Sequence, residues 1–245
     1  MALTRRRIVL LAIAIVLLPW LLSEATYGCL LATLPGRPEK TNASLPTLTA
    51  SALWASVEDG APTLERASLW EYVAKSRGPK GRTATSMVAA RYIADSRLQE
   101  SWLHSKWGGS LRWNATMAAL MVWISRHWTA EEVIASWANG AYFGDDRHGI
   151  EAASAYYFGR SSAALAPEEA ALLAAVSRSP HAFDPACHAD ATKRARDAVL
   201  DRMHAAGLLD STAASRAKEQ PVSVRPVCVT TQASSERGRG IALPE

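Results

Sequence analysis

Apolar positions recur at helical spacing through the middle of the chain. Met117, Met121, Ile124 and Trp128 lie three or four residues apart, so they would share one face of a helix. The alternation of apolar and polar residues that marks a half-buried strand does not occur at any length before Val222. The pattern predicts an all-α protein.

Start and stop signals divide this pattern into helices. Thr129 and Glu132 have the spacing of a capping box, and Pro167 is suited to the first position of a helix. Gly207 follows the amphipathic segment 190–206 as a C-terminal cap. We expect helices over residues 129–142, 149–158, 167–176 and 190–206.

The N-terminus predicts export across a membrane. Arg5, Arg6 and Arg7 precede the uncharged run from Ile8 to Leu22, which fits one membrane-spanning helix with a cytoplasmic N-terminus. Extending that helix to residue 34 would bring its glutamate close to the lipid headgroups. A cleaved signal peptide is the alternative, and it also exports the rest of the chain.

Composition shifts divide the 245 residues into four parts. Residues 1–34 are the predicted cytoplasmic tip and anchor, and residues 35–47 are rich in proline and polar residues, as a linker is. Residues 48–218 form the predicted helical domain. Residues 219–245 are rich in proline, serine and glycine and are expected to be a loose tail.

Overall composition excludes some classes of function. Apolar residues make up 49% of the chain and charged residues 20%, so the chain is globular, and a net charge of +4 gives no reason to expect a nucleic-acid partner. Cys187 and Cys228 could pair in an oxidising compartment. Of the nine tryptophans, seven lie from Trp54 to Trp128. Core packing explains most of these tryptophans. The alternative is that a few of them lie at the level of the lipid headgroups.

A series of short motifs in the C-terminal half occurs in a fixed order. Residues 137–144 read WANGAYFG, residues 148–158 read HGIEAASAYYF, and residues 169–174 read EAALLA. Ser179-Pro180 and an R-x-x-V-L-x-x-M pattern from Arg196 to Met203 follow. This series resembles the peptidoglycan glycosyltransferases of penicillin-binding proteins and their monofunctional relatives, glycosyltransferase family 51. The resemblance implies a bilobal, lysozyme-like helical domain.

The resemblance also implies a reaction and a base. The family transfers a glycan from undecaprenyl pyrophosphate to the sugar hydroxyl of lipid II, so a carboxylate must take the hydroxyl proton and cations must hold the pyrophosphate. The family's first motif is similar to residues 52–59, which makes Glu58 the candidate general base and Asp59 a substrate-binding candidate. The phenylalanine and histidine of that motif are replaced by Pro62 and Glu65.

The second and third motifs are less complete. In the second, Gly81, Thr83, Ser86 and Arg91 remain as substrate-binding candidates, while its paired glutamines are replaced by methionine and valine. Asn139 is a further candidate, either near substrate or buried between helices. The third motif, R-K-x-x-E in the family, falls on Trp113, Asn114 and Met117. Substitute cations for it are Arg82, Arg91, Arg97, Lys106 and Arg112.

Three functions remain open at this stage. The first is a lipid II polymerase in a bacterial plasma membrane, and the second is a catalytically impaired relative that binds cell-wall glycan or lipid or acts as a scaffold. The third is a lysozyme-type glycan hydrolase with Glu58 as the acid, which lacks a well-placed second carboxylate. The expected partners are lipid II, nascent glycan strands, the plasma membrane and other cell-wall synthesis proteins. The resemblance requires no cofactor or metal, and leaves room for a divalent cation at the pyrophosphate.

Overall fold

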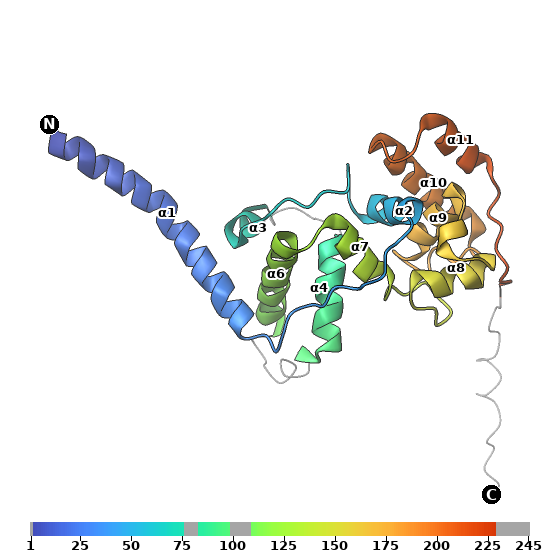
Figure 1. Ribbon diagram of the computed structural model, residues 1–245, viewed down its shortest axis with the longest axis horizontal. Helices are drawn as coiled ribbons and strands as arrows, with labels where there is room; N and C mark the ends of the chain where they lie inside the picture. The colour runs from blue at the N-terminus through green and yellow to red at the C-terminus, as the bar shows by residue number, and fades with distance from the viewer. Residues whose placement is uncertain (1, 76–82, 99–108, 229–245) are drawn as a thin grey trace, which may run out of the picture.

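The computed structural model describes residues 2–75, 83–98 and 109–228 of the chain, and the regular secondary structure in these residues is helical (Figure 1). Among them no strand forms, and the only strand-like pairing is an isolated bridge between Tyr142 and His148. The predicted all-α class is confirmed. The helices are α1 (Ala2–Ala32), α2 (Thr47–Val57), α3 (Leu69–Lys75), α4 (Ala84–Asp95), α6 (Gly109–His127), α7 (Ala130–Ala138), α8 (Ile150–Phe158), α9 (Pro167–Val176), α10 (Ala189–Ala205) and α11 (Ser211–Glu219), with a short 3₁₀ turn at Ser162–Ala164.

The local signals in the sequence mark several of these boundaries correctly. Thr129 and Glu132 form both bonds of a capping box at the start of α7. Pro167 is the first residue of α9, and Gly207, with a φ of 71°, follows the end of α10. The expectation that α7 runs towards Tyr142 is wrong, because the chain turns at Asn139 into a hairpin-like loop.

The main hydrophobic core lies between α2, α4, α7, α8, α9 and α10. Helix α2 packs on both α9 and α10, and α4 packs on α6 and α7. Small residues allow the close approach of α2 and α9: Ala52 and Ala171 are fully buried. The main core thus holds α2 and α4, the helices that carry the first two motifs.

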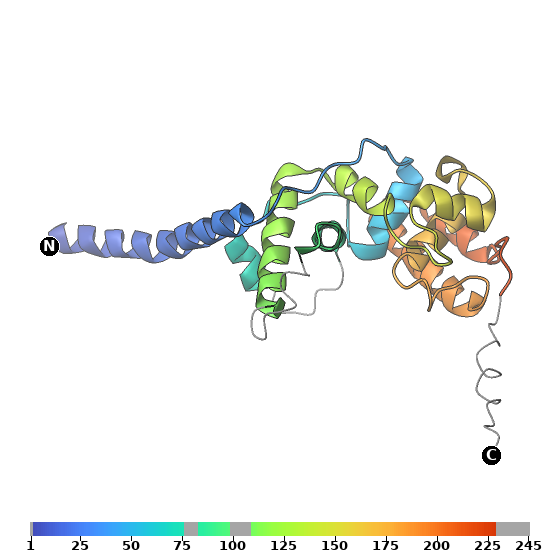
Figure 2. The ribbon, with the colours of Figure 1, turned by 90° about the horizontal axis from the view of Figure 1, so that it is seen from below.

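A second, smaller core joins the C-terminal part of α1 to α3 and α6. Tyr27 and Leu31 of α1 pack with Leu69 of α3 and with Ala119 and Val122 of α6. Figure 2 shows α1 leaving the domain beside α3, with its N-terminal part projecting away from the body. Within the described residues, none of the helices combines the length and the apolar character needed to cross a bilayer.

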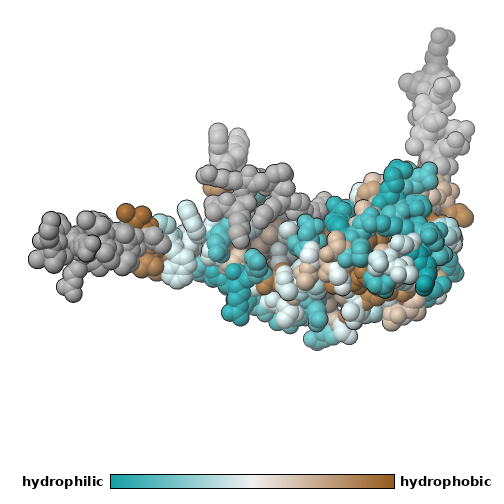
Figure 3. Space-filling view, turned by 90° about the horizontal axis from the view of Figure 1, so that it is seen from above, coloured by the Kyte–Doolittle hydropathy of each residue, from teal (hydrophilic) through white to brown (hydrophobic). Residues whose placement is uncertain are grey.

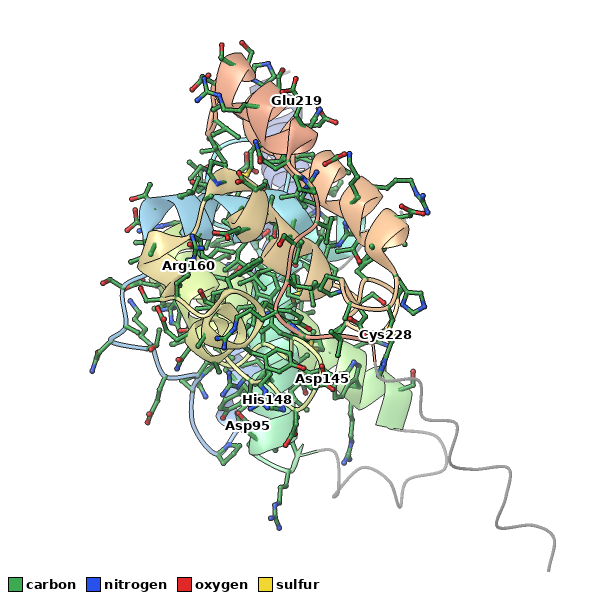
Figure 4. All side chains as sticks on the ribbon, turned by 90° about the vertical axis from the view of Figure 1, so that its right-hand side faces the viewer. Asp95, Asp145, His148, Arg160, Glu219 and Cys228 are labelled. Carbon is green, nitrogen blue, oxygen red and sulfur yellow. A yellow bond between two sulfur atoms is a disulfide. The ribbon has the colours of Figure 1, made fainter. Side chains whose placement is uncertain are left out.

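The segment after α11 is tied to the domain at several points. The buried Arg196 of α10 donates hydrogen bonds to the carbonyl oxygens of Lys218 and Gln220, and the Arg225 backbone N–H donates to the Tyr157 carbonyl at 2.9 Å. Cys187 and Cys228 form a disulfide, as the sequence allowed. Figure 4 shows this segment descending from Glu219 to Cys228 beside α10. Residues 220–228 of the expected loose tail thus lie against α8 and α10.

Candidate functional site

Glu58 follows directly after the last residue of α2, and its backbone is fixed by the helix end. Its N–H donates to the Trp54 carbonyl at 2.8 Å. The Trp54 indole N–H donates in turn to the Gly60 carbonyl at 3.1 Å, so the turn after α2 is held from both sides. Trp54 itself is buried in the main core, which makes the position of Glu58 a consequence of core packing.

The Glu58 carboxylate reaches the N-terminus of α4. Its Oε1 accepts a hydrogen bond from the Ala84 backbone N–H at 2.9 Å. The same helix end is closed by a capping box in which the side chains of Thr83 and Ser86 each accept from the other residue's backbone N–H. Three of the predicted site residues therefore meet at one helix terminus, where unpaired N–H groups and the helix dipole stabilise negative charge.

Asp59 lies on the exposed side of this turn, close to cations that the motifs did not indicate. Burial lowers the pKa of Arg202, the charge of Arg178 lowers it further, and the Asp59 carboxylate opposes both effects. Arg202 also donates to the Ser56 carbonyl at 3.0 Å, at the end of α2. Arg202 lies on α10 and Arg178 just after α9, so no local spacing in the sequence relates either of them to Asp59.

Arg91 lies further along α4, about 10 Å from Ala84 at the helical rise of 1.5 Å per residue. It forms an exposed ion pair with Asp95, with 3.3 Å between Nε and Oδ2. Its guanidinium lies directly over Gly140, so closely that a Cβ at position 140 would be 0.9 Å from Arg91 Nη1. Arg91 is therefore near Asn139 and the end of α7, at the opposite end of α4 from Glu58.

Asn139 is the C-terminal cap residue of α7 and is exposed, so the alternative in which it is buried between helices is wrong. It opens the hairpin-like loop that ends at Gly149. This loop is anchored by the buried Tyr157, whose hydroxyl donates to the Phe143 carbonyl at 2.8 Å and whose pKa is raised, chiefly by burial. Figure 4 shows Asp145 and His148 of the loop on the same side of the molecule as Asp95 of α4.

The third-motif positions lie on α6 and are used mainly for packing. Trp113 and Met117 are half-buried and pack against the main core, while Asn114 is exposed. Two of the three positions thus face the interior, where apolar side chains are favoured over charges.

The remaining candidates divide into exposed residues and residues outside the described part of the chain. Arg97 and Arg112 are exposed. Gly81, Arg82 and Lys106 lie outside the described residues. Across residues 2–75, 83–98 and 109–228, the histidines, cysteines and carboxylates form no group of three that could hold a metal ion.

Comparison with known proteins shows what the C-terminal half of the chain is similar to. Residues 88–204 match the family described as Transglycosylase. Penicillin-binding protein 2a of Streptococcus pneumoniae is 33% identical over 96 residues, which are 39% of this chain and 13% of the relative. Penicillin-binding protein 1C of Escherichia coli is 29% identical over 160 residues, 64% of this chain and 19% of the relative. Penicillin-binding protein 1A of Pseudomonas aeruginosa is 28% identical over 143 residues, 58% of this chain and 16% of the relative.

Residues 88–204 are thus similar to the transglycosylase domain of penicillin-binding proteins, which confirms the resemblance seen in the motifs. The match supports a peptidoglycan glycosyltransferase-like function in general terms. It begins at Val88, after Glu58 and after the capping box of α4. The chain spans less than a fifth of the length of these three relatives.

Proposed function

We propose that this protein is a membrane-anchored peptidoglycan glycosyltransferase that polymerises lipid II, with Glu58 as the general base. The observation that supports this most directly is the bond from the Ala84 N–H to the Glu58 carboxylate. It joins the first motif to the second through the start of α4. A carboxylate held at a helix N-terminus is stabilised as the anion, which is the form that can take a proton from the acceptor hydroxyl.

Arg91 is the proposed contact to the pyrophosphate. Its ion pair with Asp95 is exposed, and such pairs contribute little to stability, so an anionic ligand could displace Asp95 at small cost. Because Arg91 lies along α4 from Ala84, the site of proton transfer at Glu58 would be separate from the site that binds the charged leaving group. Asp59, Gly81, Thr83, Ser86 and Asn139 remain proposed substrate contacts.

The proposed organisation of the chain follows the sequence prediction. Residues 1–34 would be the cytoplasmic tip and anchor, residues 35–47 the linker, residues 48–218 the glycosyltransferase domain and residues 219–245 the tail. The domain would face the outside of the plasma membrane, where lipid II and nascent glycan strands are its partners. The proposed fold of the domain is the bilobal, lysozyme-like arrangement.

The test is glycan polymerisation by the purified full chain supplied with lipid II. Glu58→Gln keeps an oxygen that can accept from the Ala84 N–H, so stability should not change, while the rate should fall by about 10²–10⁴-fold with the loss of the base. Glu131→Gln changes an exposed glutamate of α7 and should leave the rate as it is. A Glu58→Gln variant as active as the wild type would remove Glu58 from the mechanism.

A second candidate function is binding of cell-wall glycan or lipid without turnover. It is favoured by Trp113 and Met117, which pack against the core at positions where the family carries charges. Binding of lipid II or glycan strands with no polymer formed, by wild type and Glu58→Gln alike, would select this candidate over the first.

A further inference from the structure

Two adjoining grooves lie between α1 and α3, away from Glu58 and Arg91. One has a volume of about 540 Å³ and is lined by Ile15, Leu17 and Pro19 together with the indoles of Trp20 and Trp70. The other, of about 700 Å³, shares the same two indoles. Both volumes fall within the roughly 300–1,000 Å³ typical of small-molecule sites.

The two grooves differ in chemistry. The first is apolar along its whole lining. The second is lined by Arg66, Arg126 and His127, with Glu71 as its one acidic lining residue. Since Trp20 and Trp70 belong to both, they form the boundary between an apolar half and a basic half of one continuous groove.

The basic half is built into the domain. Arg126 is held by a bidentate ion pair with Glu24, at 2.7 and 2.8 Å, and by a bond from its Nε to the Ala67 carbonyl. His127 stacks on Trp123, and its Nδ1 donates to the Trp123 carbonyl, since a carbonyl only accepts.

The apolar half is continuous with an exposed apolar surface on α1. Leu18, Leu21 and Leu22 are each about half exposed, as are Trp20 and Trp70. Figure 3 shows a hydrophobic patch, in brown, on the part of α1 that projects from the domain. Large exposed apolar surfaces mark interaction sites, and tryptophans at the edge of such a surface, next to basic residues, are typical of the lipid headgroup level.

We propose that this groove binds one anionic phospholipid of the bilayer. Its acyl chain would lie against Leu17 and Trp70, and its phosphate would be bound by Arg66. The site rests on the proposed membrane location of α1 and is independent of the role of Glu58. It makes α3 a lipid-contacting helix that sets the height of the domain above the membrane.

The experiment is native mass spectrometry of the detergent-purified full chain titrated with phosphatidylglycerol. One lipid should be retained per chain. Arg66→Gln removes a charge-assisted contact and Trp70→Ala removes apolar contact area, and each should weaken retention by about tenfold. The controls are Arg216→Gln on α11 and Leu111→Ala on α6, which remove an exposed arginine and an exposed leucine outside the groove. Both should retain lipid as the wild type does.

Further measurements distinguish binding of the whole lipid from binding of phosphate alone, and distinguish lipid binding from catalysis. Inorganic phosphate should not compete, and phosphatidylcholine should bind more weakly than phosphatidylglycerol. Glu58→Gln should retain lipid normally, so failure of the glycosyltransferase proposal would not be mistaken for failure of this one. Retention that is equal in Arg66→Gln, Trp70→Ala and both controls would overturn the site, as would equal binding of the two lipids.

Discussion

The position of the Arg91 side chain depends on a single residue of another segment, Gly140. The guanidinium lies in the space that a Cβ at position 140 would occupy. Because Gly140 follows Asn139 at the end of α7, this contact brings a cation of the second motif to the WANGAYFG segment. The glycine is needed here for close approach and not for an unusual backbone conformation.

Gly140→Ala should therefore displace the Arg91 side chain and weaken donor binding by about tenfold. The protein should still fold, because the end of the Arg91 side chain is flexible and can move away from the added methyl group. The measurement is the KM for a glycan donor carried on undecaprenyl pyrophosphate, with thermal unfolding as the check on the fold. Gly28→Ala is the matched control, because nothing lies within 4 Å of its added Cβ. The double variant Arg91→Ala/Gly140→Ala tests the contact itself. If its loss of donor affinity equals the product of the two single losses, the two residues do not act through one contact.

The sequence predicted the site residues unevenly. Glu58, Thr83 and Ser86 could be named as candidates because their motifs are local, and their meeting at the start of α4 is consistent with the alignment. Arg178, Arg202 and Gly140 were missed as neighbours of the site. Their roles depend on distances between helices far apart in the chain, which spacing in one sequence does not encode.

Helix ends illustrate the interactions that operate at the scale of elements. The pKa of Glu132 is lowered first by the hydrogen bond from Lys40 and then by the backbone N–H of Thr129. Lys40 belongs to the segment before α2, so this carboxylate both caps α7 and holds that segment against it.

A carboxylate with a lowered folded-state pKa stabilises the protein above its unfolded pKa of about 4.3 and loses that effect as the pH falls through the folded value. Wild type should therefore exceed Glu132→Gln in free energy of unfolding at pH 7, and the difference should shrink below about pH 4. Glutamine preserves the acceptor of the capping box, so the comparison isolates the charge. Denaturant unfolding at several pH values measures it, and a difference that stays constant down to pH 3 would contradict the assignment.

The disulfide ties the C-terminal segment to the start of α10. It closes a loop with a sequence separation of 41 residues. Removing it with Cys187→Ser and Cys228→Ser should lower the free energy of unfolding by about 2–4 kcal/mol, because the unfolded chain gains freedom. Cys29→Ser, at the exposed free cysteine of α1, should have no such effect. Unfolding curves of the oxidised protein that are the same with and without the pair would count against a structural role.

Secondary structure was the part of the fold most readily predicted, because capping boxes, an N-terminal proline and a C-terminal glycine act within a few residues. The sequence did not predict that α7 ends at Ala138, since the loop that replaces its last turn is fixed by Tyr157 from α8. It also did not predict α11, whose end is held by the buried Arg196 of α10.

At the scale of the whole molecule, α1 is continuous with the domain through its last turns. Glu24 and Arg126 form a bidentate pair, and the Arg126 guanidinium lies 4.7 Å from the centre of the Tyr27 ring. Both charged side chains are about three-quarters buried, so this is a stronger contact than a surface pair. The direction in which α1 leaves the domain is therefore fixed by α6.

A double-mutant cycle with Glu24→Ala and Arg126→Ala should give a coupling energy of about 1–3 kcal/mol in the unfolding of the detergent-solubilised chain. The cycle is needed because Arg126 also bonds the Ala67 carbonyl and contributes through it. Lys193 and Asp197, an exposed pair on α10, provide the comparison and should couple by less than about 1 kcal/mol. A Glu24–Arg126 coupling no larger than that of the exposed pair would mean that α1 is only loosely attached.

The packing of Trp113 and Met117 has a consequence for any attempt to introduce the family's third motif into this protein. Reinstating the family's arginine and glutamate there would put charges against the main core, while Asn114 could become lysine freely because it is exposed. A single charged substitution at 113 or 117 would cost stability before it could add any contact to substrate. Introducing the motif would therefore require compensating changes in the core first.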